Sequence, residues 1–339
     1  MNRSENLIRV PSVPPAVIDA LRACRSPLMI AHVVPDADAL GSALALARAC
    51  ASSECEAKVL LPSGSLSQKL AFLPEWSDVP IVEKTDLHGV DALVVLDTAR
   101  KSRCNVGETL KETDWSAGRR LLNIDHHATN TNFGDVNWVD PEAGSTSELV
   151  YYLLRAGGWP VDATTASLLY GGIQTDTSGF SLATTTPAAL QAAAELAARG
   201  ARIADLGERL FRSHRKSEFD LLRVIYANTK LLDGGVSYSS ASYEEIHGAG
   251  CTAADIDDQV NVPRSLDGVR LAMLFTEGVK GKTRINFRAS GSVTVVELAV
   301  QFGGGGHAQS AGAVLDCGLQ EAIDRVLPRA LEHVRKFPP

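Results

Sequence analysis

Residues 28–51, LMIAHVVPDADALGSALALARACA, contain a strand followed directly by a helix. The apolar run 28–33 is short enough for a buried strand, and the alanine- and leucine-rich segment 39–51 has the composition and length of a helix. His32, Asp36 and Asp38 lie where the strand gives way to the helix. In open α/β sheets ligands bind at this edge, so the stretch predicts both a fold class and the place of a site.

The same alternation continues along the first part of the chain. Further strand candidates lie at 57–61, 92–96 and 121–124, and helical patterns lie at 147–154 and 187–199. The last helix has a threonine at its expected N-cap and a proline in its first turn. We therefore expect an α/β catalytic domain with a parallel sheet over residues 1–200.

A second α/β pattern begins near residue 235. Its strand candidates are 236–243, 269–275, 284–289 and 311–315, and its helix candidates are 252–261, 295–302 and 319–336. Apolar periodicity at 203–232 indicates a connecting helix, so we expect residues 201–234 to link the first domain to a smaller one over 235–339. Two domains suit a chain of 339 residues, and a substrate would bind in the cleft between them.

Composition excludes several classes of function. The net charge of -7 gives no general attraction for polyanions, so long duplex nucleic acid is not expected as a partner, and any phosphate site must be local. No stretch has the length of a membrane span or the pattern of a signal peptide, which favours a cytoplasmic protein without a membrane partner. Six cysteines without a CxxC pair indicate reduced thiols rather than a disulfide framework or a zinc ribbon.

Acids and histidines follow the predicted strands at the edge where parallel strands end. Asp97 follows the third strand, and Asp125, His126 and His127 follow the fourth. With the three polar residues after the first strand, they bring carboxylates and imidazoles from three strands to one place. These donors, without cysteine, favour manganese, cobalt or magnesium over structural zinc. Two divalent ions would let so many acids coexist.

Each of these residues has a simpler explanation when it is taken alone. An aspartate after a strand is usually a turn or cap residue, His32 alone could be a core histidine, and residues 125–127 alone could be a polar loop. The segment Ser145 to Glu148 reads as an N-cap and first helical turn. Only the convergence of several acids and histidines favours a functional site.

Four motifs, in order, resemble those of the DHH phosphoesterase superfamily. They are HVVPDADALGS at 32–42, LDTA at 96–99, DHHATN at 125–130 and GIQTDTSGF at 172–180. A fifth stretch, FGGGGHAQSAGA at 302–313, resembles the DHHA1 domain of the branch that includes oligoribonucleases and 3'-phosphoadenosine 5'-phosphate phosphatases. The resemblance covers nearly the whole chain. It implies hydrolysis of phosphate esters with two divalent ions, expected to be manganese, with magnesium or cobalt as alternatives.

The resemblance also implies roles for individual residues. It assigns one ion to His32, Asp36 and Asp97. It assigns the other ion to Asp38, Asp97, His126 and Asp176, so that Asp97 would bridge the two. His127 would lie beside the scissile phosphate and give a proton to the leaving oxygen, with no covalent enzyme intermediate. Asp125 and Asn130 are expected to support the histidines from behind.

Substrate contacts are expected mainly from the second domain. The glycine run can let backbone amides surround an anion, with Gly304, Gly305, Gly306 and His307 as the candidates. The alternative for such a run is a flexible turn. The candidate phosphate-binding arginines are Arg288, then Arg264, with Arg103 in the first domain.

We expect the substrates to be oligonucleotides of two to five residues, cleaved to mononucleotides, or small phosphorylated nucleotides such as 3'-phosphoadenosine 5'-phosphate. One alternative is a linear dinucleotide (pApA) or cyclic dinucleotide phosphodiesterase. Another is a pyrophosphatase or polyphosphatase, and a third, from a different class, is a non-catalytic nucleotide-binding regulator. A homodimer is common for α/β enzymes of this size, although no interface can be read from the sequence.

Overall fold

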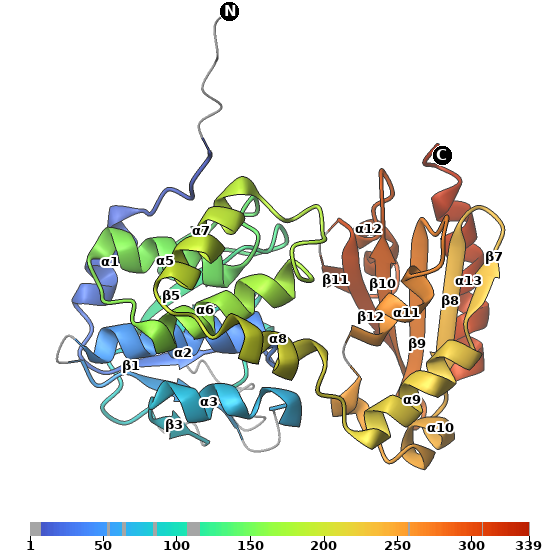
Figure 1. Ribbon diagram of the computed structural model, residues 1–339, viewed down its shortest axis with the longest axis horizontal. Helices are drawn as coiled ribbons and strands as arrows, with labels where there is room; N and C mark the ends of the chain where they lie inside the picture. The colour runs from blue at the N-terminus through green and yellow to red at the C-terminus, as the bar shows by residue number, and fades with distance from the viewer. Residues whose placement is uncertain are drawn as a thin grey trace, which may run out of the picture. The chain divides into compact units, whose positions relative to one another are not determined.

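The strands of this computed structural model fall into two separate sheets (Figure 1). The structure describes residues 8–52, 55–62, 66–83, 87–106, 116–256, 258–306 and 308–338. The chain divides into two compact units, Met1–Ser213 and His214–Pro339. This confirms the predicted α/β class with a second, smaller domain. The precise limits expected for a linker at 201–234 stay a prediction.

The described strands of the first unit form a six-stranded sheet in the order β3-β2-β1-β4-β5-β6, and every pairing in it is parallel. The strands are β1 (Pro27–Ile30), β2 (Lys58–Leu60), β3 (Ile81–Val82), β4 (Ala92–Leu96), β5 (Arg120–Asp125) and β6 (Val136–Val139). Because β1, β4 and β5 are neighbours, their carboxyl ends meet at the centre of one edge. The short edge strands β3 and β6 were not predicted.

Helices pack on this sheet as the apolar pattern requires. They are α1 (Pro15–Arg22), α2 (Ala37–Ala51), α3 (Phe72–Ser77), α5 (Thr146–Gly157), α6 (Ala163–Asp176), α7 (Pro187–Ala198) and α8 (Ile203–Phe211). The buried faces of α2, α5 and α6 share one core with Met29, Val94 and Ile124 of the strands. The alternate strand residues, such as Leu28 and Val95, face a second core on the other side of the sheet. Both faces are therefore apolar, as in a doubly covered parallel sheet.

The second unit contains a mixed sheet. Its strand order is β11-β12-β10-β9-β8-β7, in which only β8 and β9 pair in parallel among the described strands. The strands are β7 (Lys230–Leu232), β8 (Val236–Ala241), β9 (Leu271–Val279), β10 (Lys282–Ala289), β11 (Gly305–Gly306) and β12 (Ser310–Leu315). The helices are α9 (Lys216–Ala227), α10 (Tyr243–Gly248), α11 (Asn261–Arg264), α12 (Val296–Val300) and α13 (Leu319–Val334). One face of the sheet packs on α12 and α13, and the other packs on α9, α10 and α11.

Three predictions about local structure are wrong. Residues 203–232 do not form one helix but α8, α9 and β7. The strand expected at 236–243 ends at Ala241, because Ser242 and Glu245 form a capping box that starts α10. The helix expected at 252–261 is two short 3-10 turns, Ala253–Asp255 and Asp258–Val260, followed by α11. Among the described residues, no helix combines the length and the apolar character needed to cross a bilayer.

Candidate functional site

The first unit brings the predicted acids and histidines together at the carboxyl edge of β1, β4 and β5. In three groups, the ligand atoms all lie within 4.8 Å of one another. The groups are His32, Asp36 and Asp97; Asp38, His126 and Asp176; and Asp97, His126 and His127. Asp97 and His126 each belong to two groups, so the groups form one continuous cluster.

The first group forms where β1 leads into α2. Asp36 caps α2, because its Oδ1 accepts hydrogen bonds from the backbone N–H groups of Asp38 and Ala39. Its Oδ2 lies 3.6 Å from Nε2 of His32, and Oδ2 of Asp97 lies at the same distance from that nitrogen. Nδ1 of His32 lies 2.9 Å from the carbonyl oxygen of Val33. If Nδ1 donates this hydrogen bond, Nε2 keeps its lone pair toward the carboxylates, as a metal ligand requires.

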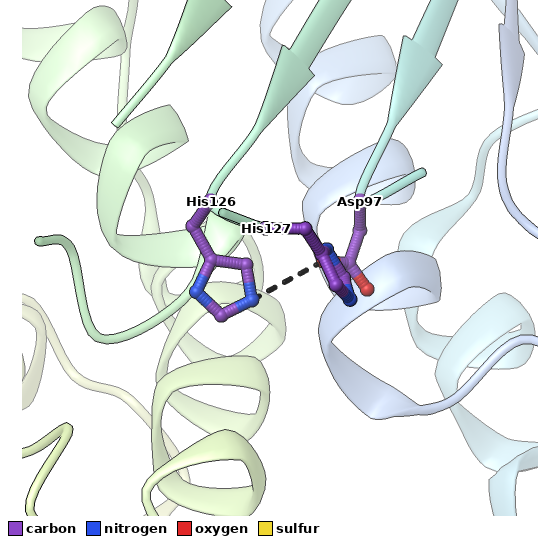
Figure 2. A group of neighbouring side chains, drawn as sticks. All are labelled: Asp97, His126 and His127. Carbon is purple, nitrogen blue, oxygen red and sulfur yellow. Dashed lines mark ion pairs between the residues drawn. The ribbon is translucent and has the colours of Figure 1, made fainter. Parts of the chain in front are cut away.

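The second group joins the ends of α6 and β5 to the start of α2. Nε2 of His126 lies 3.2 Å from Oδ2 of Asp176 and 3.5 Å from Oδ1 of Asp97. Figure 2 shows His126 and His127 at the end of one strand and Asp97 at the end of its neighbour, with the side chains converging. Nδ1 of His126 faces the carbonyl oxygen of Ala143 at 3.3 Å, which again directs Nε2 at the acids.

Close packing of α2 on α6 places Asp38 near Asp176. At Gly172 in α6, a Cβ atom would lie 2.7 Å from Oδ1 of Asp38 and 2.0 Å from Oγ of Ser147. No side chain fits there, so the glycine permits the approach of the two helices. Helix α6 was not predicted, and Asp176 was identified only by its motif.

Asp125 and Asn130 hold His127 from behind. Nδ1 of His127 lies 2.7 Å from Oδ1 of Asp125, and Nδ2 of Asn130 donates to Oδ2 of the same carboxylate at 2.6 Å. Asn130 is itself fixed by a 2.8 Å hydrogen bond to Oδ1 of Asn123. Asp125 is fully buried, and although burial acts to lower the pKa of His127, the hydrogen bond with Asp125 raises it overall. Asp125 therefore both orients the His127 ring and favours its protonated form.

The start of α5 contributes groups that sequence reasoning missed. Ser145 caps the helix as predicted, but the next two residues also bind the acids. The backbone N–H groups of Thr146 and Ser147 donate to the two oxygens of Asp38 at 2.7 and 2.8 Å. Oγ1 of Thr146 donates to Oδ1 of Asp97 at 3.0 Å. A helix N-terminus favours negative charge, so this turn positions two of the acids.

Strained backbone also gathers around the cluster. Asp97 has φ 52°, and Val34, between His32 and Asp36, has φ 59° although it is β-branched. Ser178 and Phe180, just after Asp176, have φ 47° and 66°. Such conformations cost about 1–3 kcal/mol each and persist where surrounding contacts impose them.

Burial and mutual repulsion raise the pKa of two acids in the cluster. The pKa of Asp38 is raised to about 7 by burial and by the charge of Asp97. The pKa of Asp176 is raised well above its ordinary value by burial and by Asp38. Asp97 differs: burial acts to raise its pKa, but the histidines around it, His32 first, hold the pKa below its usual range. Asp97 is thus ionised, whereas Asp38 and Asp176 beside it need a nearby cation to ionise fully.

These donors fit divalent metal ions. They are carboxylate oxygens and imidazole nitrogens, with no cysteine, which suits manganese, cobalt or magnesium. The 3.2–3.6 Å separations lie at or beyond the upper end of the hydrogen-bond range, and they are near the spacing of ligand atoms that share one ion. Cations would also remove the repulsion that raises the pKa of Asp38.

The metal-free protein is expected to be less stable at pH 8 than at pH 6. Asp38 and Asp176 have higher pKa values in the folded chain than in the unfolded chain. The free energy of unfolding therefore falls as the pH rises from about 4, the pKa in the unfolded chain, toward the pKa values in the folded chain. The raised pKa values of His32, His126 and His127 act in the same sense, because their contribution is present below about pH 6.5 and is lost above it.

Thermal unfolding after chelation measures this effect. We expect the melting temperature to fall by about 5 °C or more between pH 6 and pH 8, and saturating Mn²⁺ to reduce the difference. An identical pH dependence with and without Mn²⁺ would contradict the assignment of these acids to a metal site.

Thr146→Val is expected to lower activity or metal affinity by about 10- to 100-fold, the usual effect of losing a hydrogen bond that orients a ligand. Valine keeps the volume of the buried threonine and loses the hydroxyl that binds Asp97. Titration of the metal by calorimetry, together with turnover, measures the change. Thr283→Val is the matched control, because Thr283 is also buried but donates to the carbonyl oxygen of Cys317 in the second unit. Equal losses in both variants would show a general packing effect.

In the second unit, two of the predicted arginines are neighbours. Arg288 lies on β10, opposite Ser310 of β12, and Arg264 ends α11. Burial and then the positive charge of Arg288 lower the pKa of Arg264. The repulsion between the two positive charges would be relieved where an anion binds to both guanidinium groups.

The glycine run lies against this part of the sheet. Gly305 pairs with Gly312 of β12, which in turn pairs with Asn286 of β10, two residues from Arg288. At Gly304 a Cβ atom would lie 2.0 Å from the carbonyl oxygen of Gly312, so glycine is required for close packing on β12. Gly304 to Gly306 therefore pack on β12 and do not form the flexible turn that was the alternative from the sequence.

The two remaining candidates for substrate binding are Arg103, in the first unit, and His307. Arg103 is exposed in the 3-10 turn Lys101–Arg103 of the first unit, where its carbonyl oxygen accepts a 2.9 Å hydrogen bond from Val33 N–H, next to His32. The backbone of Arg103 therefore lies near the acid cluster. His307 lies outside the described residues.

The chain is similar to known proteins over nearly its whole length. Residues 28–173 match the model of the DHH family N-terminal domain, and residues 235–337 match the DHHA1 domain. The bifunctional oligoribonuclease and PAP phosphatase NrnA of Thermus thermophilus is 36% identical, over 94% of this chain and 93% of the relative. The protein of the same name from Bacillus subtilis is 29% identical, over 83% and 87%.

A solved structure shares the fold. An exopolyphosphatase-related protein from Bacteroides fragilis has a TM-score of 0.83 and 24% identity, and the match covers 96% of this chain and 98% of that one. A parallel sheet whose carboxyl edge gathers acids and histidines that could hold a metal ion, in a chain with these relatives, defines a metal-dependent phosphoesterase. The chain belongs to the DHH family, and its second unit is a DHHA1 domain.

Proposed function

We propose that this protein hydrolyses very short oligonucleotides to mononucleotides with two divalent metal ions, and that it also removes the 3'-phosphate of 3'-phosphoadenosine 5'-phosphate. The observation that carries the proposal is the cluster at the carboxyl edge of β1, β4 and β5, in which Asp97 belongs to two of the ligand groups. The relatives named for both activities support the choice of substrates.

One ion would be held by His32, Asp36 and Asp97, and the other by Asp38, Asp97, His126 and Asp176. Such ions supply positive charge to the phosphate oxygens and make a nucleophile available from water near neutral pH. The side chains around them keep the acids in place: the N-terminus of α5 holds Asp38, and Thr146 holds Asp97.

His127 is the proposed proton donor to the leaving oxygen. Its Nδ1 is bound to Asp125, which fixes the ring and raises its pKa, so that Nε2 can give up a proton as the ester bond breaks. Proton transfer at this step lowers the cost of charge on the leaving oxygen. No side chain in the cluster is needed as a covalent nucleophile.

Arg288 and Arg264 are the proposed anchors for a second phosphate or a terminal nucleotide. Paired guanidinium groups prefer a dianionic terminal phosphate over the single charge of an internal phosphodiester. An anchor of this kind favours substrates that carry a terminal phosphate. The net charge of -7 also disfavours long polyanions.

Parallel assays of purified protein with Mn²⁺ test the proposal. The substrates are 5'-phosphorylated dinucleotides including pApA, longer RNA, 3'-phosphoadenosine 5'-phosphate and pyrophosphate, with mononucleotide and inorganic phosphate measured separately. We expect fast release of mononucleotide from dinucleotides that declines with length, and release of phosphate from the bisphosphate. Turnover confined to pyrophosphate, or binding of nucleotides without turnover, would overturn the proposal in favour of a pyrophosphatase or a regulator.

A further inference from the structure

Glu148, in the first turn of α5, is a fully buried carboxylate that the proposed mechanism does not use. Its Oε2 accepts a 2.7 Å hydrogen bond from the backbone N–H of Gly144. Its Oε1 has no hydrogen-bond partner among the residues that the structure describes. A buried carboxylate with an unpaired oxygen lowers the stability of the fold, so a role beyond helix capping is needed to explain it.

The hydrogen bond to Gly144 differs from that of an ordinary capping box. In such a box, the glutamate at the third helical position binds the backbone N–H of the N-cap residue, as Glu245 does with Ser242 in α10. Glu148 has the same position after the N-cap Ser145, but it binds the N–H of the residue before Ser145. The carboxylate therefore fixes a peptide group that lies outside the helix.

The same peptide group also contacts His126. Its carbonyl oxygen, which belongs to Ala143, lies 3.3 Å from Nδ1 of His126, and because a carbonyl oxygen can only accept, Nδ1 is the donor of this hydrogen bond. Its N–H, which belongs to Gly144, donates to Glu148. One planar peptide group thus links the carboxylate to the imidazole. Space around it is limited, since a Cβ atom at Gly144 would lie 3.0 Å from the carbonyl oxygen of Thr184.

The charges of Glu148 and His126 also act on each other. Burial raises the pKa of Glu148 to about 7, whereas the hydrogen bond from Gly144 and the positive charge of His126 act to lower it. Negative charge on Glu148 polarises the peptide group between them, which makes its carbonyl oxygen a stronger acceptor for Nδ1. A histidine whose Nδ1–H is firmly bound in this way directs the lone pair of Nε2 at an ion.

We propose that Glu148 is a positioning residue for His126 and acts through the peptide group between Ala143 and Gly144. Ligand histidines commonly donate their other ring N–H to a carboxylate or a backbone carbonyl, and here a carbonyl group receives the proton while a carboxylate holds that carbonyl in place. The inference rests on the proposed function, in which His126 holds one of the two ions.

The effect of Glu148 is expected at one ion only. His126 belongs to the ligand group of Asp38, whereas the histidine of the other proposed site, His32, faces the carbonyl oxygen of Val33. Loss of Glu148 should therefore weaken one ion site and leave the other, which a general loss of stability would not do.

Titration of the full-length protein with Mn²⁺ by calorimetry, fitted to two sites, tests the inference. Glu148→Met keeps the length of the side chain but removes the acceptor and the charge. We expect the affinity for one ion to fall by about 10- to 100-fold and the affinity for the other to change by less than about threefold. Glu148→Gln keeps an acceptor oxygen for Gly144 and should restore the affinity to within about fivefold of the wild-type value.

A second readout needs no metal ion. In the chelated protein, the Nδ1 proton of His126 is buried and held by Ala143, so it should give an imidazole N–H signal in the NMR spectrum, assigned by its absence in His126→Gln. The signal should persist in Glu148→Gln and shift or disappear in Glu148→Met.

Glu245→Met is the matched control. Glu245 is also the third residue of its helix and accepts hydrogen bonds from Ser242 and Asn228, but it lies in the second unit. This variant should lower the melting temperature and leave both Mn²⁺ affinities unchanged.

The possible failures can be told apart. Wild-type affinity for both ions in Glu148→Met, with the His126 signal unchanged, would overturn the inference and leave the proposed ion sites standing. Equal weakening of both ions would overturn it as well, because Glu148 would then serve the fold alone. A wild-type protein that binds no Mn²⁺ would instead overturn the proposed function, and the inference with it.

Discussion

Replacement of Asp97 by asparagine is expected to reduce turnover by more than about 10³-fold, which corresponds to several kcal/mol of lost transition-state stabilisation. Asp97 lies within reach of His32, His126 and His127, and its carboxylate belongs to two ligand groups. An amide keeps the size of the side chain but loses its negative charge and one acceptor oxygen. Both proposed ions would therefore be weakened by one substitution.

Asparagine is chosen because it also tolerates the backbone of this position. Asp97 has φ 52°, a left-handed conformation in which asparagine is among the least strained residues. Loss of activity can then be separated from loss of fold by circular dichroism and by the melting temperature. Alanine at the same position is expected to abolish turnover as well.

Asp135→Asn provides the control. Asp135 accepts a 2.8 Å hydrogen bond from the backbone N–H of Leu121, near the start of β5 and away from the carboxyl edge. This variant should retain turnover within about twofold, as expected for a change remote from the site. Full activity in Asp97→Asn, with the metal content unchanged, would contradict the proposed bridging role.

The second large effect is expected from the arginine pair. Replacing Arg288 and Arg264 together by methionine should lower kcat/KM for 5'-phosphorylated dinucleotides by about 100-fold or more, mainly through KM. Methionine keeps much of the aliphatic packing of each half-buried side chain and removes the charge. The substrate would lose its anchor while the acid cluster in the first unit stays intact.

A substrate without a second phosphate distinguishes anchoring from a general loss of function. Hydrolysis of bis-(p-nitrophenyl) phosphate, followed by absorbance, should be nearly unchanged in the double variant. Arg329→Met on α13 is the matched control, because Arg329 is exposed and pairs only loosely with Glu332 at 3.5 Å. A parallel loss on both substrates would argue against a phosphate anchor at the two arginines.

Much of the fold could be predicted because local signals agreed with it. The apolar runs before His32, Asp97 and Asp125 are strands, and the helix after Asp36 begins where the aspartate caps it. Predictions of local structure failed where a polar capping residue starts a helix or where an element is very short. Ser242 starts a helix through a capping box inside a run that looks like a strand, and the edge strand Ile81–Val82 is too short for its periodicity to be detected.

For the site, the sequence indicated which residues could hold a cation. Carboxylates and histidines after three apolar runs indicate a cation-binding edge, because parallel strands end on the same side. The order of the motifs also indicated the family. Neither inference needed coordinates, since both rest on residue type and spacing along the chain.

Only the tertiary structure decided which groups hold those residues in place. Thr146 reads as an ordinary first-turn residue, yet the fold brings its hydroxyl to Asp97, 49 positions earlier in the chain. Arg264 and Arg288 become neighbours because α11 packs beside β10. Contacts of this kind depend on how helices and strands distant in sequence pack together, and a single sequence does not encode that packing as a local pattern.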